Sequence, residues 1–335
     1  MKAMLFCAGV GSRLSPITDV LPKPMIDFFG RPLVDYVLPL LGRLGADEVV
    51  VNLHHRPDVL RRHLEARWGK AFRFRFSEEA HLLGTGGGLK KAEGLFSGGS
   101  FLAANSDFLL DPSVSMGQML DFHSRTGAAA TMLLREDATG KYTPLELDEN
   151  GRISRLGSLF GTHDPNRPLH AFCGLQVLQP AVFWPLPPSG PSNLITAYVE
   201  MLRSGLMVQG FVFDGYWQEL GDLDGYRRAH FDVLDGTSPY RSVIEEVGAY
   251  AVLQDKSAIG GLDGSGIALG AGARIEPPVA LGRSCVIGDG AVVGPYAVIG
   301  EGARIGPGAL VSRSIAWRGV KIAGNARIED QIVHE

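Results

Sequence analysis

Residues 2–16 of this chain read KAMLFCAGVGSRLSP. The apolar run that opens this stretch is typical of a short β-strand, and the glycines at positions 9 and 11 follow it directly. The backbone N–H groups of a glycine-rich turn can hold phosphate oxygens, so a strand that leads into such a turn is typical of nucleotide-binding α/β folds. The stretch therefore predicts an α/β domain with a phosphate site after its first strand.

The details of this turn exclude two common phosphate motifs. Leu14 stands where a dinucleotide fingerprint has its third glycine, and no Gly-Lys-Ser/Thr follows, as a Walker loop requires. Arg13 instead supplies a forked and permanent positive charge. Further along, Lys23 lies between Pro22 and Pro24, whose rings fix the backbone on both sides of it. We expect a phosphate-binding loop that is supported by two cations.

Strand-like and helix-like patterns alternate up to about residue 235, which predicts a Rossmann-like, mainly parallel sheet wrapped by helices. In such sheets ligands bind beyond the carboxyl ends of the strands, where the glycine turn falls. The strands are expected at 3–7, 48–53, 72–76, 100–104 and 128–134, and the helices at 33–44, 58–68, 87–96 and 116–125.

The last third of the chain repeats an apolar residue every six positions, and a small residue and a turn glycine recur beside it. This period predicts a hexapeptide β-helix, with a capping coil where the period slips by one near Lys321. The apolar series is Leu269, Ile275, Leu281, Ile287, Val293, Ile299, Ile305, Val311 and Trp317, and Ile322 and Ile328 resume it. The expected domains are therefore 1–235, a linker at 236–250, and a β-helix at 251–335.

Length and composition limit the classes of protein that fit. The chain has 335 residues, 45% of them hydrophobic and 20% charged, which suits a globular protein of two domains. A net charge of −4 argues against a nucleic-acid partner, and no apolar run is long enough for a membrane span. Cys7, Cys173 and Cys285 lie far apart without metal-ligand spacing, and the N-terminus lacks a signal-peptide pattern, so we expect a cytoplasmic protein.

Taken together, the opening motifs resemble those of the sugar-1-phosphate nucleotidyltransferases. GVGSRLSPIT at 9–18, PKP at 22–24 and GRPL at 30–33 match the opening of that family. The resemblance continues through VVVNLHH, LGTGGGLKKA, FLAANSD, CGLQVLQPAVF and GYWQELGD, and many members end in a left-handed hexapeptide β-helix. The partners it implies are a nucleoside triphosphate and a sugar 1-phosphate, with pyrophosphate as the leaving group.

The resemblance also implies a catalytic centre built from Arg13, Lys23, Asp107 and a divalent metal ion, taken as Mg²⁺. Asp107, in Asn-Ser-Asp, matches a metal-binding aspartate of the family. The second metal-binding aspartate falls on Glu219, which is one methylene longer, and Asp222 is a possible substitute. By the same resemblance the nucleotide and sugar lie against Ala8, Gly9, Gly11, Ser12, Glu79, Gly84, Thr85, Asn105 and Gly174.

Glu79 occupies the position that reads the base edge in the family. A carboxylate only accepts hydrogen bonds, so it suits the N–H edges of guanine, uracil or thymine. The alternative is an ordinary surface glutamate, given Glu78 beside it. We expect the base to lie against residues 83–88, whose glycines permit a close approach of the backbone. In the sugar pocket, the segment 172–175 resembles the family, but the Glu-Lys-Pro whose lysine binds the sugar phosphate is missing.

Several functions stay open on the sequence alone. The β-helix, Asn-Ser-Asp and KYTPLELDENGRI favour a mannose-1-phosphate guanylyltransferase, whereas the triple glycine and FCGLQVL favour uridylyl transfer to an amino-sugar phosphate such as N-acetylmuramic acid 1-phosphate. The change at Glu219 admits a catalytically silent regulatory subunit. Acyl transfer by the β-helix is disfavoured, because the sequence has no histidine between His230 and His334. We expect the β-helix to serve assembly into a homo-oligomer.

Overall fold

The computed structural model describes residues 1–96, 98–137, 139–255 and 266–334. It divides into two compact units, of which the first comprises Met1–Ile26 and Leu33–Glu219 and the second Asp27–Pro32 and Leu220–Glu335. The division after residue 219 lies earlier than the predicted boundary at 235. The predicted linker at 236–250 contains helix α8 (Tyr240–Val247), because that helix packs within the second unit.

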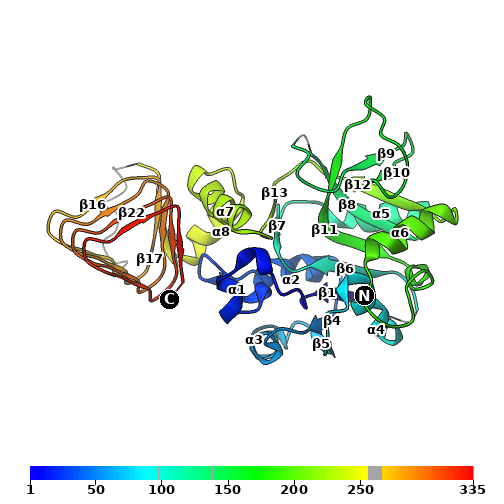
Figure 1. The fold of residues 1–335 in the computed structure, drawn as a ribbon, viewed down its shortest axis with the longest axis horizontal. Helices are drawn as coiled ribbons and strands as arrows, with labels where there is room; N and C mark the ends of the chain where they lie inside the picture. The colour runs from blue at the N-terminus through cyan, green and yellow to red at the C-terminus, as the bar shows by residue number, and fades with distance from the viewer. Residues whose placement is uncertain (97, 138, 256–265, 335) are drawn as a thin grey trace. The chain divides into compact units, whose positions relative to one another are not determined.

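The first unit is built on a nine-stranded mixed sheet, drawn in Figure 1 from blue to green. Strand β1 lies between β6 and β4 and pairs in parallel with both, and β4 pairs in parallel with β5. Strand β11 runs antiparallel to both β6 and β8, so the expected parallel sheet is interrupted there. The strands are β1 (Lys2–Phe6), β4 (Glu48–Leu53), β5 (Arg73–Glu78), β6 (Phe101–Asn105), β8 (Ala130–Glu136), β9 (Leu145–Leu147), β10 (Ile153–Leu156), β11 (His170–Leu178) and β12 (Val208–Val212).

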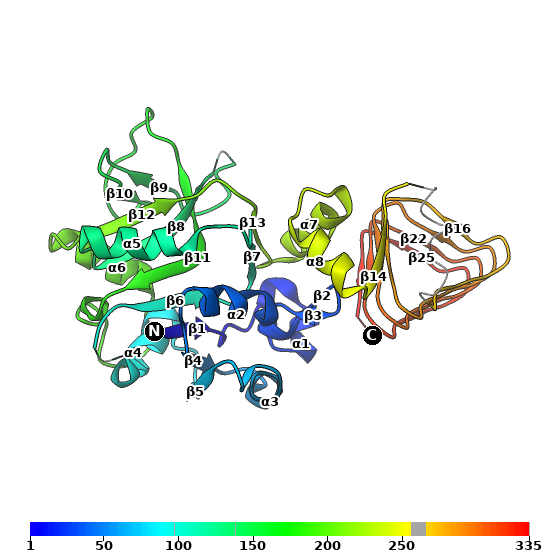
Figure 2. The same cartoon turned by 180° about the vertical axis from the view of Figure 1, so that it is seen from behind.

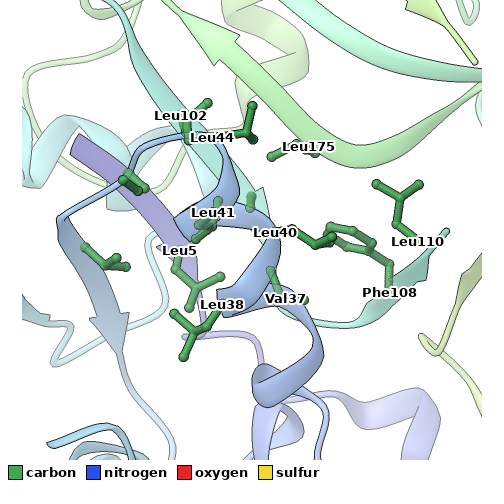
Figure 3. Close-up of a cluster of buried hydrophobic side chains, with 14 of the residues drawn as sticks. Leu5, Val37, Leu38, Leu40, Leu41, Leu44, Leu102, Phe108, Leu110 and Leu175 are labelled. Carbon is green, nitrogen blue, oxygen red and sulfur yellow. The ribbon is translucent and has the colours of Figure 1, made fainter. Parts of the chain in front are cut away.

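Alternation along the strands gives this sheet two apolar faces. On β1, Leu5 packs with α2 and α3 on one face, whereas Met4 packs with α4 and α6 on the other. Figure 3 shows Leu38 and Leu41 of α2 beside Leu5, which fits the three-residue spacing of a buried helix face. Each such leucine contributes about 1.5–3 kcal/mol when fully buried. The helices are α2 (Val34–Arg43), α3 (Pro57–Trp68), α4 (Gly84–Lys91), α5 (Met116–Thr126) and α6 (Leu194–Arg203).

A short hairpin, β2 (Asp27–Phe28) with β3 (Arg31–Pro32), belongs to the second unit, although it is surrounded in sequence by the first. Its Phe28 and Phe29 rings pack on His230 of α7 (Leu223–Asp235), at centroid distances of 4.6 and 4.9 Å. The buried Tyr226 hydroxyl donates a hydrogen bond to the carbonyl of Asp27. These contacts explain why the unit boundary falls before α7.

The β-helix of the second unit is the stack of short strands coloured yellow to red in Figures 1 and 2. Its strands form three parallel ladders, and β14 (Tyr250–Leu253) adds antiparallel to the first strand of one of them, β17 (Val279–Gly282). The first ladder is β17, β20 (Ala297–Ile299), β23 (Ile315–Ala316) and β26 (Ile332–Val333). The second is β15 (Ala268–Leu269), β18 (Val286–Ile287), β21 (Arg304–Ile305) and β24 (Lys321–Ile322), and the third is β16 (Arg274–Ile275), β19 (Val292–Val293), β22 (Leu310–Ser312) and β25 (Arg327–Glu329). Val279 pairs with Ala297 and Arg274 with Val292, so three hexapeptides make one turn of the helix. The predicted hexapeptide left-handed β-helix is confirmed.

Two residues of the predicted apolar series differ from the buried, in-register position that the period predicts. Leu269 pairs in register with Ile287 but is 42% exposed, and among the described residues it lies on the first strand of its ladder. Ile299 pairs with Ala316 rather than with Trp317, so the coil has already lost one residue before Lys321. Trp317 takes the place after the buried position, and its indole N–H donates to the Tyr226 hydroxyl at 2.9 Å.

The glycines that follow the apolar residues at 281, 299 and 305 are required by close packing and not by a positive φ, whereas Gly294 of the same series has a φ of +110°. Gly282, Gly300 and Gly306 do not have a positive φ, in contrast to the prediction of turn glycines. A Cβ at Gly282 would lie 2.4 Å from the backbone nitrogen of Glu301 in the next coil. The coils therefore stack with no space for a side chain at these positions.

Within the described residues, none of the helices combines the length and the apolar composition that crossing a bilayer demands.

Candidate active site

Three parallel strands of the first unit end side by side and place their polar residues together. At the carboxyl end of β1, Phe6 is the register partner of both Asn52 on β4 and Asn105 on β6. The glycine turn follows β1 directly, and Asp107 lies two residues past Asn105. The Ser106 hydroxyl donates to the carbonyl of Phe6 at 2.8 Å, which ties the Asn-Ser-Asp segment to β1.

A two-stranded ladder brings Glu219 to Asp107. Strand β7 (Phe108–Leu110) begins directly after Asp107, and β13 (Trp217–Glu219) pairs antiparallel to it with Glu219 opposite Phe108. The two carboxylates are more than a hundred positions apart in sequence, yet this register sets them at the same end of the ladder. The predicted pair of metal-binding residues is therefore close in space.

The two carboxylates face two cations. The Lys23 ammonium forms an ion pair with Asp107, and the Arg13 guanidinium lies 3.9 Å from Glu219. Burial raises the pKa of Glu219, and the negative charge of Asp107 adds to this rise. An ion of charge +2 would relieve the repulsion between the carboxylates, and their oxygens are the ligands that Mg²⁺ prefers. Among the described residues no group of three His, Cys, Asp or Glu side chains could hold a metal.

Two adjoining cavities open at these residues and share Phe6, Thr85, Asn105 and Asp107 in their walls. The smaller cavity has a volume of about 340 Å³, and its other lining residues are Cys7, Ala8, Gly9, Lys23, Pro24, Asn52, Glu79, Leu82, Gly84 and Ser106. The larger cavity has a volume of about 490 Å³, and Arg13, Phe108, Tyr142, Phe172, Gly174, Gln176, Asn193, Tyr198, Trp217 and Glu219 are among its lining residues. Ligands bound in the two cavities would therefore meet at Asp107.

Glu79 is buried in the wall of the smaller cavity and is not a surface glutamate. One of its carboxylate oxygens accepts from the Asn52 side-chain amide at 2.8 Å, and the other accepts from the Leu83 N–H at 2.9 Å. Asn52 in turn accepts from the Cys7 N–H at 2.7 Å. The neighbouring Glu78 is exposed and forms an ion pair with Arg61 instead. The network fixes the Glu79 carboxylate as an oriented hydrogen-bond acceptor.

The glycines at 84, 87 and 88 lie so close to other parts of the protein that no side chain would fit there. A Cβ at Gly84 would lie 2.5 Å from the carbonyl oxygen of Ser192, and one at Gly87 would lie 2.5 Å from that of Gly190. A Cβ at Gly88 would lie 2.6 Å from the Glu79 carboxylate. These contacts give the glycines a role in packing, and the position of the base against residues 83–88 stays a prediction, with Gly84 and Thr85 in the lining of the smaller cavity. The glycines let α4 pack against residues 190–192 and Glu79.

Aromatic and polar side chains line the larger cavity. The rings of Tyr142 and Trp217 pack at a centroid distance of 4.9 Å, and the Tyr198 hydroxyl donates to Gln176 at 2.6 Å. Gly174 has a φ of +84°, and a Cβ there would lie 2.6 Å from the Phe108 ring. This wall suits a ligand that has both apolar ring faces and hydroxyl groups.

Three described residues that the sequence analysis named for the site are not among the lining residues of the two cavities. Asp222 caps the N-terminus of α7, where its carboxylate accepts from the Gly225 N–H at 2.7 Å, so it has a structural role that explains its presence. Gly11 and Ser12, both described by the structure, are not among the lining residues of either cavity. Gly11 is in the left-handed region, and its carbonyl accepts from the Thr18 hydroxyl at 2.9 Å, so it shapes the turn instead.

Sequence reasoning missed several lining residues. Asn52 was detectable as a polar residue at the end of a buried apolar strand. Tyr142 and Asn193 lie in loops without a local pattern, and only the fold brings them to the larger cavity. Asn193 also caps α6 by accepting from the Ile195 N–H at 3.0 Å.

Comparison with known proteins gives two matches to family models. Residues 2–236 match the family described as nucleotidyl transferase, and residues 278–313 match the bacterial transferase hexapeptide of six repeats. The chain is 27% identical to mannose-1-phosphate guanylyltransferase 1 of Arabidopsis thaliana, over 99% of this chain and 86% of that protein. It is 30% identical to mannose-1-phosphate guanyltransferase of Debaryomyces hansenii, over 78% and 70% respectively. Its fold is similar to the inositol-1-phosphate CTP transferase of T. maritima, with a TM-score of 0.57 and 18% identity over 67% of this chain and 90% of that one.

Proposed function

This chain belongs to the nucleotidyl transferase family as a sugar-1-phosphate nucleotidyltransferase, and on that premise we propose that it makes GDP-mannose from GTP and mannose 1-phosphate. A phosphate oxygen of the sugar 1-phosphate attacks the α-phosphorus of GTP, the bond to the β-phosphate breaks, and pyrophosphate leaves. The curated relatives support the choice of guanine and mannose by their names. Within this chain, the observation that carries the choice of guanine is the orientation of the two carboxylate oxygens of Glu79 as hydrogen-bond acceptors.

The base is assigned to the smaller cavity, with its N–H edge on Glu79. Each carboxylate oxygen already accepts one hydrogen bond within the protein and keeps capacity for a second. Guanine presents N1–H and N2–H₂ on one edge, so it can donate to both oxygens, whereas uracil presents a single N3–H. Adenine and cytosine would direct acceptor atoms at the same carboxylate. The buried acceptor pair therefore favours GTP.

The cations of the site bind and orient the phosphates. In this proposal the glycine turn at Ala8 and Gly9 supplies backbone N–H groups, and Lys23 and Arg13 supply positive charge at the reacting phosphate. Charge placed in advance where negative charge develops in the transition state accelerates the reaction without reorganisation during the step. The prolines on both sides of Lys23 restrict its backbone, and the ion pair with Asp107 holds its ammonium.

A magnesium ion fits the proposed centre, with Asp107 and Glu219 as its protein ligands. When bound, it would neutralise phosphate charge and help the leaving pyrophosphate. With Asp107 and Glu219 assigned to the metal ion, Arg13 and Lys23 are the side chains with which the protein itself contacts the phosphates. The longer side chain of Glu219 is compatible with this role because β13 sets its Cα directly opposite Phe108. The β-helix is assigned to assembly of a homo-oligomer in the cytoplasm.

The test is the initial rate of pyrophosphate release with five nucleoside triphosphates against mannose, glucose and amino-sugar 1-phosphates. We expect the highest kcat/KM for GTP with mannose 1-phosphate. A preference for UTP with an amino-sugar 1-phosphate would replace the substrate assignment, and binding of a nucleotide sugar without any turnover would replace catalysis with regulation. Glu79→Gln should lower kcat/KM for GTP by about 10- to 100-fold, as expected for a lost hydrogen bond to a charged group. The exposed neighbour provides a matched control in Glu78→Gln, which should leave it unchanged.

A further inference from the structure

A sugar 1-phosphate would bring more negative charge into the larger cavity than the lining residues balance. A phosphate monoester carries nearly two negative charges at neutral pH. Of the described residues that line this cavity, Arg13 alone carries a positive charge, whereas Asp107 and Glu219 are both acidic. Arg13 also lies 3.9 Å from Glu219, and Lys23 is paired with Asp107. A magnesium ion on Asp107 and Glu219 would offset these two carboxylates, which leaves the single charge of Arg13 against the nearly two negative charges of the sugar phosphate. A second cation beside the cavity would balance them.

Lys141 stands at the edge of the cavity wall. The two residues after it, Tyr142 and Thr143, line the cavity. Its ammonium lies 5.6 Å from the centroid of the Tyr142 ring, which itself packs on Trp217. Trp217 begins the strand that ends at Glu219, so Lys141 is attached to the same wall as the catalytic carboxylate.

Arg135 also adjoins this wall, and its guanidinium donates to the carbonyl of Trp217 at 3.4 Å. The ammonium of Lys141 instead lies beside the ring of Tyr142, a residue that lines the cavity. Tyr142 packs on Trp217, from which β13 continues to Glu219, so the contact with Tyr142 places the Lys141 ammonium beside the wall that ends at the reacting groups.

We propose that Lys141 binds the phosphate group of the sugar 1-phosphate. A lysine suits this task because its ammonium is a compact point charge on a flexible stem and a common phosphate binder. The inference rests on the proposed function, because it assumes that the larger cavity takes the sugar substrate. It adds a second positive charge to the one that Arg13 supplies in the lining of this cavity.

The test compares Lys141→Met, Lys141→Arg and a control, Lys70→Met, which removes an exposed lysine after α3. Lys141→Met should raise KM for the sugar 1-phosphate by about 10- to 100-fold, the range for a hydrogen bond to a charged group, and leave KM for the nucleotide within about twofold. Lys141→Arg should restore most of the affinity. An unchanged KM for the sugar phosphate, or an equal rise in both KM values, would overturn the proposal.

The experiment separates this proposal from the proposed function. If the unaltered protein turns over a sugar 1-phosphate and Lys141→Met does so with the same KM, the lysine assignment alone fails. If the unaltered protein turns over none of the sugar phosphates, the proposed function fails, and calorimetric titration with mannose 1-phosphate then decides the role of Lys141. Equal affinity of the unaltered and Lys141→Met proteins in that titration refutes it, and a 10-fold loss in the variant supports it.

Discussion

Asp27→Asn should make the second unit more stable at neutral pH and leave its stability unchanged in acid. Asp27 opens the hairpin that packs on α7, and its carboxylate accepts from the Gly30 N–H at 3.0 Å. Burial raises the pKa of Asp27 to about 6, which outweighs the opposing effects of this hydrogen bond and of Arg318. The folded unit therefore carries an ionised aspartate at pH 7 in a place that favours the neutral acid.

The size of the effect follows from this pKa. The folded-state value of about 6 lies above the ordinary value of 3.8, so the folded state binds the proton more tightly. Protonation stabilises the unit fully below about pH 4, and this stabilisation is lost as the pH rises through 6. At 1.36 kcal/mol for each pH unit the total is at most about 3 kcal/mol, and partial exposure of Asp27 reduces it to about 1–3 kcal/mol. Asparagine keeps the acceptor for Gly30 and does not carry the charge.

The assay is hydrogen exchange by mass spectrometry on the full chain between pH 4 and pH 8, corrected for the intrinsic exchange rate. Peptides from Leu223–Asp235 report the opening free energy of the second unit. At pH 7.5 we expect the opening free energy of Asp27→Asn to exceed that of the unaltered protein by about 1–3 kcal/mol. At pH 4 we expect this difference to be less than about 0.5 kcal/mol. The control Asp121→Asn removes an exposed aspartate on α5. If the opening free energies of Asp27→Asn and the unaltered protein differ by the same amount at every pH, the reasoning from burial is refuted.

Substitutions at four further residues test the site. Arg13→Ala should lower kcat by about 100-fold or more, as for the loss of one electrostatic donor, and near-normal turnover would contradict its role. Asp107→Asn should abolish metal-dependent turnover with an unchanged melting temperature, so activity within a few-fold at saturating Mg²⁺ would disprove the ligand assignment. Glu219→Asp should retain measurable activity and Glu219→Gln should lose most of it, whereas a silent Gln variant would leave Asp107 as the sole protein ligand. Gly88→Ala should raise KM for the nucleotide and destabilise the fold by about 1–3 kcal/mol, because its Cβ would meet the Glu79 carboxylate; wild-type KM and melting temperature would argue against that packing.

Local sequence patterns were sufficient to predict those helices and strands whose buried residues recur at a regular spacing. The strands that begin at Lys2 and Glu48 and the helix Val34–Arg43 lie within a residue or two of their predicted positions, because one or both faces of each are buried. The six-residue period predicted the β-helix for the same reason. The glycine turn, Lys23 and Asp107 were also found, since each follows a recognisable motif.

Long-range pairing accounts for what the sequence did not reveal. The ladder that sets Glu219 opposite Phe108 joins segments without local periodicity, so its register has no signal in either one. The hairpin Asp27–Pro32 packs with α7, almost two hundred residues later, and this contact moves the unit boundary. Likewise, only the stacked coils show that a Cβ at Gly282 or Gly300 would clash with the backbone of the next coil.

The ladder of β7 and β13 also has an evolutionary consequence. Because Asp107 and Glu219 are held by the pairing of their own strands, the distance between them does not depend on the chain that joins the strands. That chain, from Asp111 to Tyr216, supplies Tyr142, Phe172 and much of the remaining wall of the larger cavity. Insertions and substitutions there can reshape the acceptor pocket while the two carboxylates keep their register. One catalytic centre can thus be inherited intact while its choice of acceptor diverges.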